Sequence, residues 1–158
     1  IRDRNSIAQL LTPGRSLCQA RSSSTKQAFE LIADAVAREQ EVGHPAELVA
    51  GLLAREKLGS TGLGKGIAIP HCRLRDCEAP LGVLVTLATP APFDAPDERD
   101  VDLLFALVVP PEATQEHLNL LAELARLFSQ PEFCDALRAC RTSEVLYNTA
   151  INWGDGAS

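Results

Sequence analysis

The chain of 158 residues lacks the features of a membrane-spanning or exported protein. Its longest apolar run, Leu103 to Val109, has the length of a strand, whereas a helix that crosses a bilayer needs about 20 apolar residues. Residues 1–5 are mostly charged or polar and lack the apolar core of a signal peptide. We therefore expect a cytoplasmic protein that does not insert into a membrane.

An excess of positive charge is also missing. Lys and Arg number 15 against 21 Asp and Glu, which gives a formal net charge of −6 with the histidines neutral. Proteins that bind nucleic acids do so through clustered Lys and Arg, which neutralise the phosphates. The composition therefore predicts no nucleic-acid partner and favours a protein or a small molecule.

Cysteines are few and odd in number. The chain has five of them, and a domain of this size does not need disulfides to stabilise its core, so we expect reduced thiols. Cys72 and Cys77 flank a turn beside His71, but no second pair of Cys or His residues has the spacing of a structural zinc site. The sequence thus predicts no metal and no other cofactor. A metal or redox site at these three residues remains the alternative.

Apolar spacing predicts two helices in the first half of the chain. Residues 15–21 form a candidate edge strand, and Ser24 with Gln27 fits a capping box that begins a helix. A second helix is expected over 45–57, since a proline stands in its first turn and Gly59 lies just past its end. The residues spaced to face a core are Phe29, Ile32, Ala33 and Val36 in the first helix and Leu48, Leu52 and Leu53 in the second.

The second half of the chain continues the alternation of strands and helices. Strands are predicted at 81–88 and 101–109, separated by a Pro-rich link over 89–99, and the later strand is apolar nearly throughout, as in a strand covered on both faces. Helices over 114–129, 131–140 and 143–151 should follow, the first with an apolar stripe of Leu118, Leu121, Ala122, Ala125 and Phe128. We find no internal repeat, and we expect a single α/β domain over 1–158.

Glycine is concentrated in one segment. From Gly59 to Gly66 every second or third residue is glycine, and the apolar residues 67–69 and Pro70 then lead to His71. This pattern predicts a loop that enters a brief strand ending at the histidine. Converging backbone N–H groups would suit phosphoryl oxygens, and the histidine would present one ring nitrogen while the other is hydrogen-bonded. A tight glycine turn followed by a surface histidine explains the local pattern equally well.

The segment 59–71, GSTGLGKGIAIPH, resembles the active-site motif of the fructose/mannitol class of phosphotransferase-system IIA domains, above all their free-standing nitrogen-regulatory members. The resemblance covers about residues 7–148 and includes the segments 55–58, REKL, and 110–118, PPEATQEHL. It implies an α/β fold with a mixed sheet of about five strands flanked by helices.

The resemblance also implies roles for individual residues. The family's phosphorylated histidine maps onto His71, and its neighbouring arginine and second histidine map onto Arg55 and His117. The implied phosphoryl-binding loop consists of Ser60, Thr61, Gly62, Gly64 and Gly66.

Two residues depart from the family pattern. Cys72 stands where the family usually has glycine, and Lys65 stands where it often has asparagine. Cys72 would place a thiol next to the nucleophile, where it would limit the approach of a donor or respond to oxidants. Lys65 would add positive charge near the phosphoryl site. Neither change removes the chemistry.

Charge alone leaves the roles of Arg55 and His117 open. Arg55 offers a fork of donors to phosphoryl oxygens, but a cation in the last turn of a helix is favoured with or without a ligand. If Thr114 caps the following helix, His117 lies in its first turn, where the helix dipole opposes protonation. A neutral His117 would donate a hydrogen bond to a phosphoryl oxygen or to His71. The alternative is a histidine at the start of the helix that has no partner. His44 is interpreted as structural.

Together these assignments predict a phosphoryl carrier. A donor of the HPr type, charged from phosphoenolpyruvate, would phosphorylate Nε2 of His71, with Arg55 and the loop amides stabilising charge and His117 orienting the site. The phosphorylated protein would serve nitrogen or metabolic regulation through protein targets. One alternative is delivery of phosphate to the IIB domain of a fructose/mannitol-type permease. Another is a binding module in which phosphorylation of His71 only changes contacts with partners.

Overall fold

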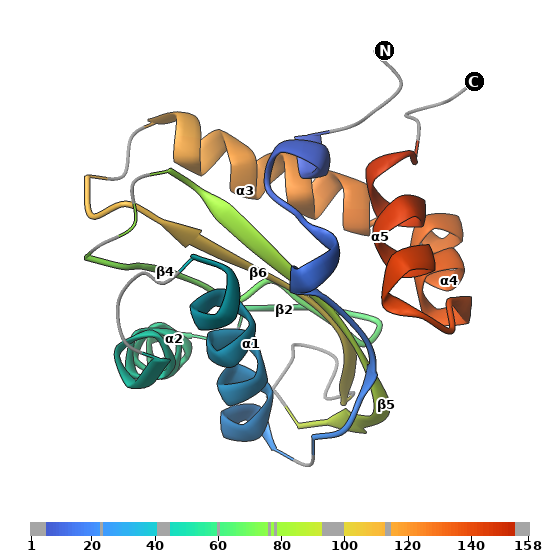
Figure 1. Cartoon of the computed structure of the whole chain (residues 1–158), viewed down its shortest axis with the longest axis horizontal. Coiled ribbons are helices and arrows are strands. Elements are labelled where there is room, and N and C mark those ends of the chain that lie inside the picture. Colours follow the sequence, from blue (N-terminus) through green and yellow to red (C-terminus); the bar gives the residue numbers. More distant parts are fainter. Residues whose placement is uncertain are drawn as a thin grey trace.

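A mixed sheet runs through the middle of the molecule, with helices on both faces (Figure 1). The computed structural model describes residues 6–22, 24–40, 45–59, 61–75, 77, 79–92, 100–112 and 115–153. The strands are β1 (Ser16–Ala20), β2 (Gly62–Gly64), β3 (Ile67–Ala68), β4 (His71–Arg73), β5 (Leu81–Ala91) and β6 (Val101–Val109). The helices are α1 (Thr25–Gln40), α2 (Pro45–Leu58), α3 (Gln115–Phe128), α4 (Pro131–Ala139) and α5 (Ser143–Ile151), with short 3-10 helices η1 (Ser6–Gln9) and η2 (Pro13–Arg15).

Strand β6 organises the sheet. The order is β1-β5-β6-β3-β2, and β4 also pairs with β6. β5 runs antiparallel to β6, whereas β3 and β4 both run parallel to it, β3 beside Leu103 and β4 beside Leu107. Between them, the carbonyl of Pro70 accepts a hydrogen bond from the Leu107 N–H at 2.9 Å. β3 and β4 therefore follow one edge of β6, which sets the position of His71 at the start of β4.

The sheet has a separate apolar core on each face. Helices α1 and α2 cover one face, and α3, α4, α5 and η1 cover the other (Figure 1). Residues of β6 alternate between the cores, because successive side chains of a strand point to opposite faces. Leu104 and Ala106 belong to the first core, while Leu103 and Phe105 belong to the second. Eight of the nine residues in β6 are buried, so the predicted double coverage of this strand is confirmed.

Most predicted elements are confirmed. β1 lies at an edge of the sheet, α2, β6, α4 and α5 fall where the sequence places them, and Leu48 and Leu52 are buried. The Oγ of Ser24 accepts a hydrogen bond from the Gln27 N–H at 3.1 Å, so the predicted cap of α1 is present. The mixed sheet flanked by helices is confirmed as well, with six strands rather than about five.

Three local predictions are wrong. The glycine segment is a hairpin of β2 and β3, and His71 begins β4 instead of ending a strand, because pairing with β6 turns the short segments into strands. In α3, Ala122 is exposed and Leu124 is buried. β5 extends through Pro90 to Ala91, into the predicted link.

Other predictions lie outside the described residues: those for Thr114, for His44 and for the rest of the link, 93–99. In the part of the chain that the structure describes, no helix combines the length and the apolar character needed to cross a membrane.

Candidate functional site

The imidazole of His71 is half-buried between the start of β4 and the last turn of α2. Its Nδ1 lies 3.1 Å from the carbonyl oxygen of Ile69, and its Nε2 accepts a hydrogen bond from Nε of Arg55 at 3.2 Å. A carbonyl oxygen and a guanidinium have opposite hydrogen-bonding roles, since the first only accepts and the second only donates. The arrangement therefore favours the neutral tautomer with hydrogen on Nδ1 and a lone pair on Nε2.

Burial lowers the pKa of His71 below its ordinary value, because the charged ring loses solvation. The hydrogen bond to the Ile69 carbonyl raises the pKa in part, the positive charge of Arg55 lowers it further, and the negative charge of Glu56 raises it. The net direction is downward, so the ring is neutral at pH 7. A neutral imidazole with a lone pair on Nε2 can act as a nucleophile once the hydrogen-bond donor on that nitrogen moves away.

The end of α2 is fastened to the segment that follows it. The NH1 group of Arg55 donates a hydrogen bond to the carbonyl of Gly59 at 2.8 Å. The carboxylate of Glu56 accepts two hydrogen bonds from Thr61, one from the backbone N–H at 2.9 Å and one from the hydroxyl at 2.8 Å. Thr61 is buried. Arg55 thus faces His71 from a helix end that is held at two points.

Two cavities open beside His71 and Arg55. One, of about 600 Å³, lies between α2, β4 and β6, and the other, of about 230 Å³, lies beside Thr61 and Gly62. Leu58, which is 84% exposed, lines the first cavity, and Leu63, which is 44% exposed, lines the second. His71 is therefore flanked by exposed apolar side chains, as at a surface that receives another protein.

The structure divides the predicted phosphoryl-binding loop into two parts. Thr61 and Gly62 line a cavity with His71, whereas Gly64 and Gly66 do not and Ser60 lies outside the described residues. Gly64 and Gly66 have φ angles of 92° and 83° and form the turn between β2 and β3. A left-handed backbone explains glycine at both positions. Because the N–H of Thr61 is already bound by Glu56, it is not free for a phosphoryl group.

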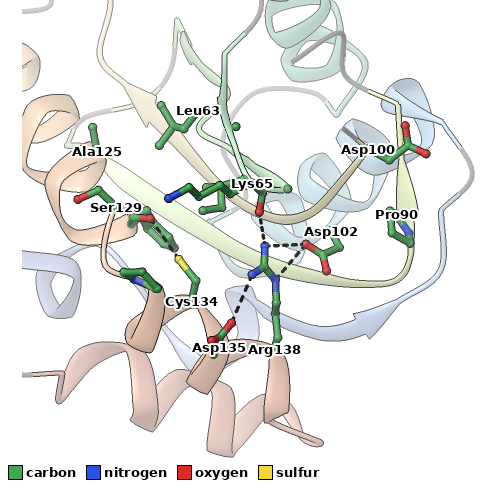
Figure 2. A pocket seen from close by; sticks show the side chains of 15 residues that line it. Leu63, Lys65, Pro90, Asp100, Asp102, Ala125, Ser129, Cys134, Asp135 and Arg138 are labelled. Atoms are coloured by element: carbon green, nitrogen blue, oxygen red, sulfur yellow. Dashed lines mark hydrogen bonds and ion pairs between the residues drawn. The ribbon is translucent and has the colours of Figure 1, made fainter. Parts of the chain in front are cut away.

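The hairpin turn borders a third, larger cavity of about 1050 Å³ (Figure 2). Figure 2 shows the Lys65 side chain in this cavity, with Arg138 joined to the Lys65 carbonyl at 2.8 Å and to Asp102 at 3.0 Å. Lys65 does not line either of the cavities that contain His71. The structure thus places this departure from the family pattern at the far end of the hairpin, away from His71.

Cys72 follows His71 in β4 and lines the same cavity between α2 and β4. A Cβ on Gly51 of α2 would lie 3.3 Å from the Cys72 sulfur, so the thiol packs against this glycine. Burial raises the pKa of the Cys72 thiol to about 12, which keeps it protonated at neutral pH. The expected response to oxidants is therefore unsupported, because the thiolate is the reactive form.

The metal alternative also lacks support in the described part of the chain. No group of three or more His, Cys, Asp or Glu residues there is arranged to hold a metal ion. The thiol of Cys77 is buried and donates to the carbonyl of Ala79 at 3.0 Å. His117 lies in the first turn of α3, as predicted, but its side chain is outside the described residues.

The fold defines the class of protein. The crystal structure of mannitol IIA from Escherichia coli superposes with a TM-score of 0.72 at 17% identity, covering 89% of this chain and 98% of that one. Residues 9–152 match the family of the phosphoenolpyruvate-dependent sugar phosphotransferase system described as EIIA 2, and the chain belongs to this family. It is therefore a phosphoryl-carrier component of the phosphotransferase system, and the resemblance of the glycine-histidine motif is confirmed.

More similar relatives are nitrogen regulatory proteins. That of Pseudomonas aeruginosa is 46% identical over 150 residues, which cover 95% of this chain and 97% of the relative. That of Escherichia coli K12 is 43% identical over 137 residues, covering 86% of this chain and 81% of the relative. The crystal structure of nitrogen regulatory protein IIA-Ntr from Neisseria meningitidis has a TM-score of 0.84 and 36% identity, covering 92% of this chain and 99% of that one. The chain thus falls in the nitrogen-regulatory branch.

Proposed function

We propose that this protein accepts a phosphoryl group on Nε2 of His71 from an HPr-type donor and uses its phosphorylation state for regulation. The observation that carries the proposal is the position of the His71 ring. Nδ1 lies against the Ile69 carbonyl, and the Nε2 lone pair accepts a hydrogen bond from Arg55. Among the described residues, no other charged side chain is hydrogen-bonded to the ring. A fixed neutral histidine beside a guanidinium suits attack on phosphorus.

Transfer begins when Arg55 releases the Nε2 lone pair, to which it donates in the resting protein. Nε2 attacks phosphorus in line, the P–Nε2 bond forms, and the bond from phosphorus to the donor breaks. The Nδ1 hydrogen stays in place, and the Ile69 carbonyl stabilises the positive character that the ring gains. The freed guanidinium binds the phosphoryl oxygens with two parallel donors. His117, in the first turn of α3, is proposed to orient the same oxygens.

The surface around His71 supports a protein as donor and acceptor. Leu58 and Leu63 are exposed on either side of the site, and burial of such residues drives association. The relatives' names favour regulatory targets over a permease. Mannitol IIA of Escherichia coli, which has been solved in complex with phosphorylated mannitol IIB, shares the fold at a TM-score of 0.69 but only 16% identity. Delivery to a IIB domain is therefore the less favoured function.

The decisive experiment is an intact-mass measurement after incubation with phosphoenolpyruvate, the first enzyme of the system and an HPr-type donor. The wild-type protein should gain one acid-labile phosphoryl group, and His71→Ala should gain none while keeping its circular dichroism spectrum, since a strand-end residue contributes little to the core. Labelling of His71→Ala at the wild-type rate would refute the assignment. Incubation of the phosphorylated protein with a mannitol-class IIB domain should leave the label in place.

Arg55→Lys tests the role of the guanidinium. The substitution keeps the positive charge but removes the bidentate fork, so we expect transfer to slow by about tenfold or more. Single-turnover mass spectrometry with phosphorylated donor measures this rate. Arg126→Lys, on the exposed face of the last turn of α3, is the matched control and should transfer at the native rate. If Arg55→Lys and Arg126→Lys transfer at equal rates, the Arg55 guanidinium has no role in transfer and Arg55 is an ordinary surface residue.

A further inference from the structure

Glu56 takes no part in the transfer step described above, yet it binds the base of the hairpin. Its two carboxylate oxygens each accept one hydrogen bond from Thr61, from the backbone N–H and from the hydroxyl. Glu56 is half-buried and Thr61 is buried. A carboxylate that accepts two hydrogen bonds from one residue fixes both the position and the orientation of that residue.

The contact continues from Thr61 to the nucleophile. The carbonyl of Thr61 accepts a hydrogen bond from the Ile69 N–H at 3.1 Å. The carbonyl of Ile69 in turn faces Nδ1 of His71 at 3.1 Å. The three steps run from the end of α2 through the hairpin to His71, and the last one favours hydrogen on Nδ1 of the ring. Glu56 is thus connected to the tautomer of His71 through two residues.

We propose that Glu56 is a positioning residue for phosphoryl transfer, holding Thr61 and Ile69 so that the Ile69 carbonyl keeps hydrogen on Nδ1 and the lone pair on Nε2 of His71. The inference rests on the proposed function of His71 as acceptor. Because Glu56 directly follows Arg55, the same helical turn supplies both the guanidinium and the anchor of the imidazole. The anchor therefore sets the distance between the two groups that must meet the phosphoryl group.

The rate of transfer depends steeply on the position of the attacking nitrogen. Misplacement by about 1 Å at a distance from the chemistry reduces rates by about a hundredfold. Without the Glu56 carboxylate, two donors of a buried residue lose their acceptor, and the segment from Thr61 to Ile69 must move to solvate them. The negative charge of Glu56 also raises the pKa of His71, so its removal should lower that pKa further.

The hairpin provides a matched control at its opposite end. Arg138 binds the Lys65 carbonyl and Asp102 beside the larger cavity and contacts neither Thr61 nor Ile69 in the hydrogen bonds of the described residues (Figure 2). Arg138→Gln loosens the tip of the hairpin and leaves the contacts of Glu56 intact. Comparison of the two ends separates a specific effect on His71 from a general weakening of the hairpin.

The experiment compares Glu56→Gln, Thr61→Val, Thr61→Ser and Arg138→Gln. Two quantities are measured: the single-turnover transfer rate at saturating phosphorylated donor, and the ¹⁵N chemical shifts of the His71 ring, which report its tautomer and pKa. Glu56→Gln and Thr61→Val should transfer about ten to a hundred times more slowly, with ring shifts that move toward a mixture of tautomers. Thr61→Ser keeps the hydroxyl and should transfer faster than Thr61→Val, with ring shifts closer to those of the wild type, and Arg138→Gln should lower the thermal midpoint without changing the ring shifts.

Native transfer rates together with unchanged ring shifts in Glu56→Gln and Thr61→Val would overturn the proposal. Equal slowing by Arg138→Gln would overturn it too, since the effect would then come from the hairpin as a whole. If Glu56→Gln does not fold, Thr61→Val and Thr61→Ser carry the comparison. A wild-type protein that is not labelled at His71 would refute the proposed function instead, and the ring shifts would still decide whether Glu56 controls the tautomer.

Discussion

At the scale of single residues, the two ring nitrogens of His71 have different neighbours, and this difference carries the chemistry. The carbonyl of Ile69 holds Nδ1, while Arg55 faces Nε2 from another element. Burial and the charge of Arg55 both favour the neutral ring. The proposed acceptor nitrogen, Nε2, therefore belongs to a neutral ring before any donor arrives.

The pH dependence of transfer follows from this lowered pKa. An ordinary histidine becomes half protonated at a pH of about 6.5 and loses its nucleophilic lone pair. Because the pKa of His71 lies below that value, the rate at which the protein accepts a phosphoryl group should reach half its maximum at a pH below 6.5. The unfolded chain binds the proton more readily, so the free energy of unfolding should also decrease below pH 6.5 relative to His71→Gln.

Transfer rates from pH 5 to 8 and denaturant titrations of both proteins measure these effects. Since the donor has a pH dependence of its own, the donor must be phosphorylated beforehand and the rate compared with that of a second acceptor. An inflection of the rate at or above pH 6.5 that belongs to His71 would contradict the lowered pKa.

At the scale of elements, α2 and β4 pack through a pair of small residues. Gly51 lies against the Cys72 sulfur, and a Cβ at position 51 would come within 3.3 Å of it. Helix interiors favour alanine over glycine by about 0.5–1 kcal/mol, but here the thiol occupies the space. Gly51→Ala should therefore raise the free energy of unfolding more in the Cys72→Gly background than in the wild-type protein.

A double-mutant cycle with urea titrations measures that coupling. The same variants test the thiol. Because the pKa of Cys72 is raised to about 12, mild peroxide should leave transfer unchanged in the wild-type protein, and Cys72→Gly should transfer at least as fast. If the effects of Gly51→Ala and Cys72→Gly on the free energy of unfolding are additive, the Cys72 thiol does not press on α2.

The turn of the β2–β3 hairpin contains a strained residue. Lys65 has a φ of 60°, in the left-handed region, where a side chain costs about 1–2 kcal/mol relative to glycine. Lys65→Gly should raise the free energy of unfolding by about 1 kcal/mol, and Lys65→Asn should give part of that gain. Transfer should stay at the native rate in both variants, because Lys65 lines the cavity away from His71.

Lys65→Ala is the control for this prediction. It removes the long side chain but keeps the Cβ that strains the backbone, so its stability should stay close to that of the wild type. Thermal and urea unfolding of the three variants distinguish the two effects. A gain for alanine equal to that for glycine would assign the effect to the lysine side chain.

At the scale of the whole molecule, β6 brings segments that are distant in the sequence to one site. β4 pairs along its edge, α2 covers one face, and α3, which contains His117, covers the other. The site thus lies where both cores meet the edge of the sheet. Phosphorylation of His71 would therefore affect elements on both faces of the sheet.

His117 tests whether α3 responds to the phosphoryl group. Its position in the first turn of a helix opposes protonation, and the negative charge of a phosphoryl group in contact would raise its pKa. NMR titration should show the pKa of His117 rising on phosphorylation of His71, while that of His44 barely changes. Identical titration curves for His117 in both states would place its ring outside the site.

The sequence is informative wherever a local pattern determines the structure. Apolar spacing and Ser24 determine α1, the continuous apolar run determines β6, and the glycine-histidine motif identifies the family. These signals act over a few neighbouring residues, which is why they can be found in the chain alone.

Only the tertiary structure decides how the glycine segment is used. In the sequence its glycines predict one phosphoryl-binding loop, but pairing with β6 folds them into a hairpin with Thr61 at the base and Gly66 at the tip. Pairing of β4 with β6 sets Cys72 against Gly51 of α2 in a cavity that His71 also lines, and the turn carries Lys65 to a different cavity. The hydrogen bond between Arg55 and His71 joins residues 16 positions apart, and spacing along a sequence does not encode such a contact because it exists only once the strands have paired.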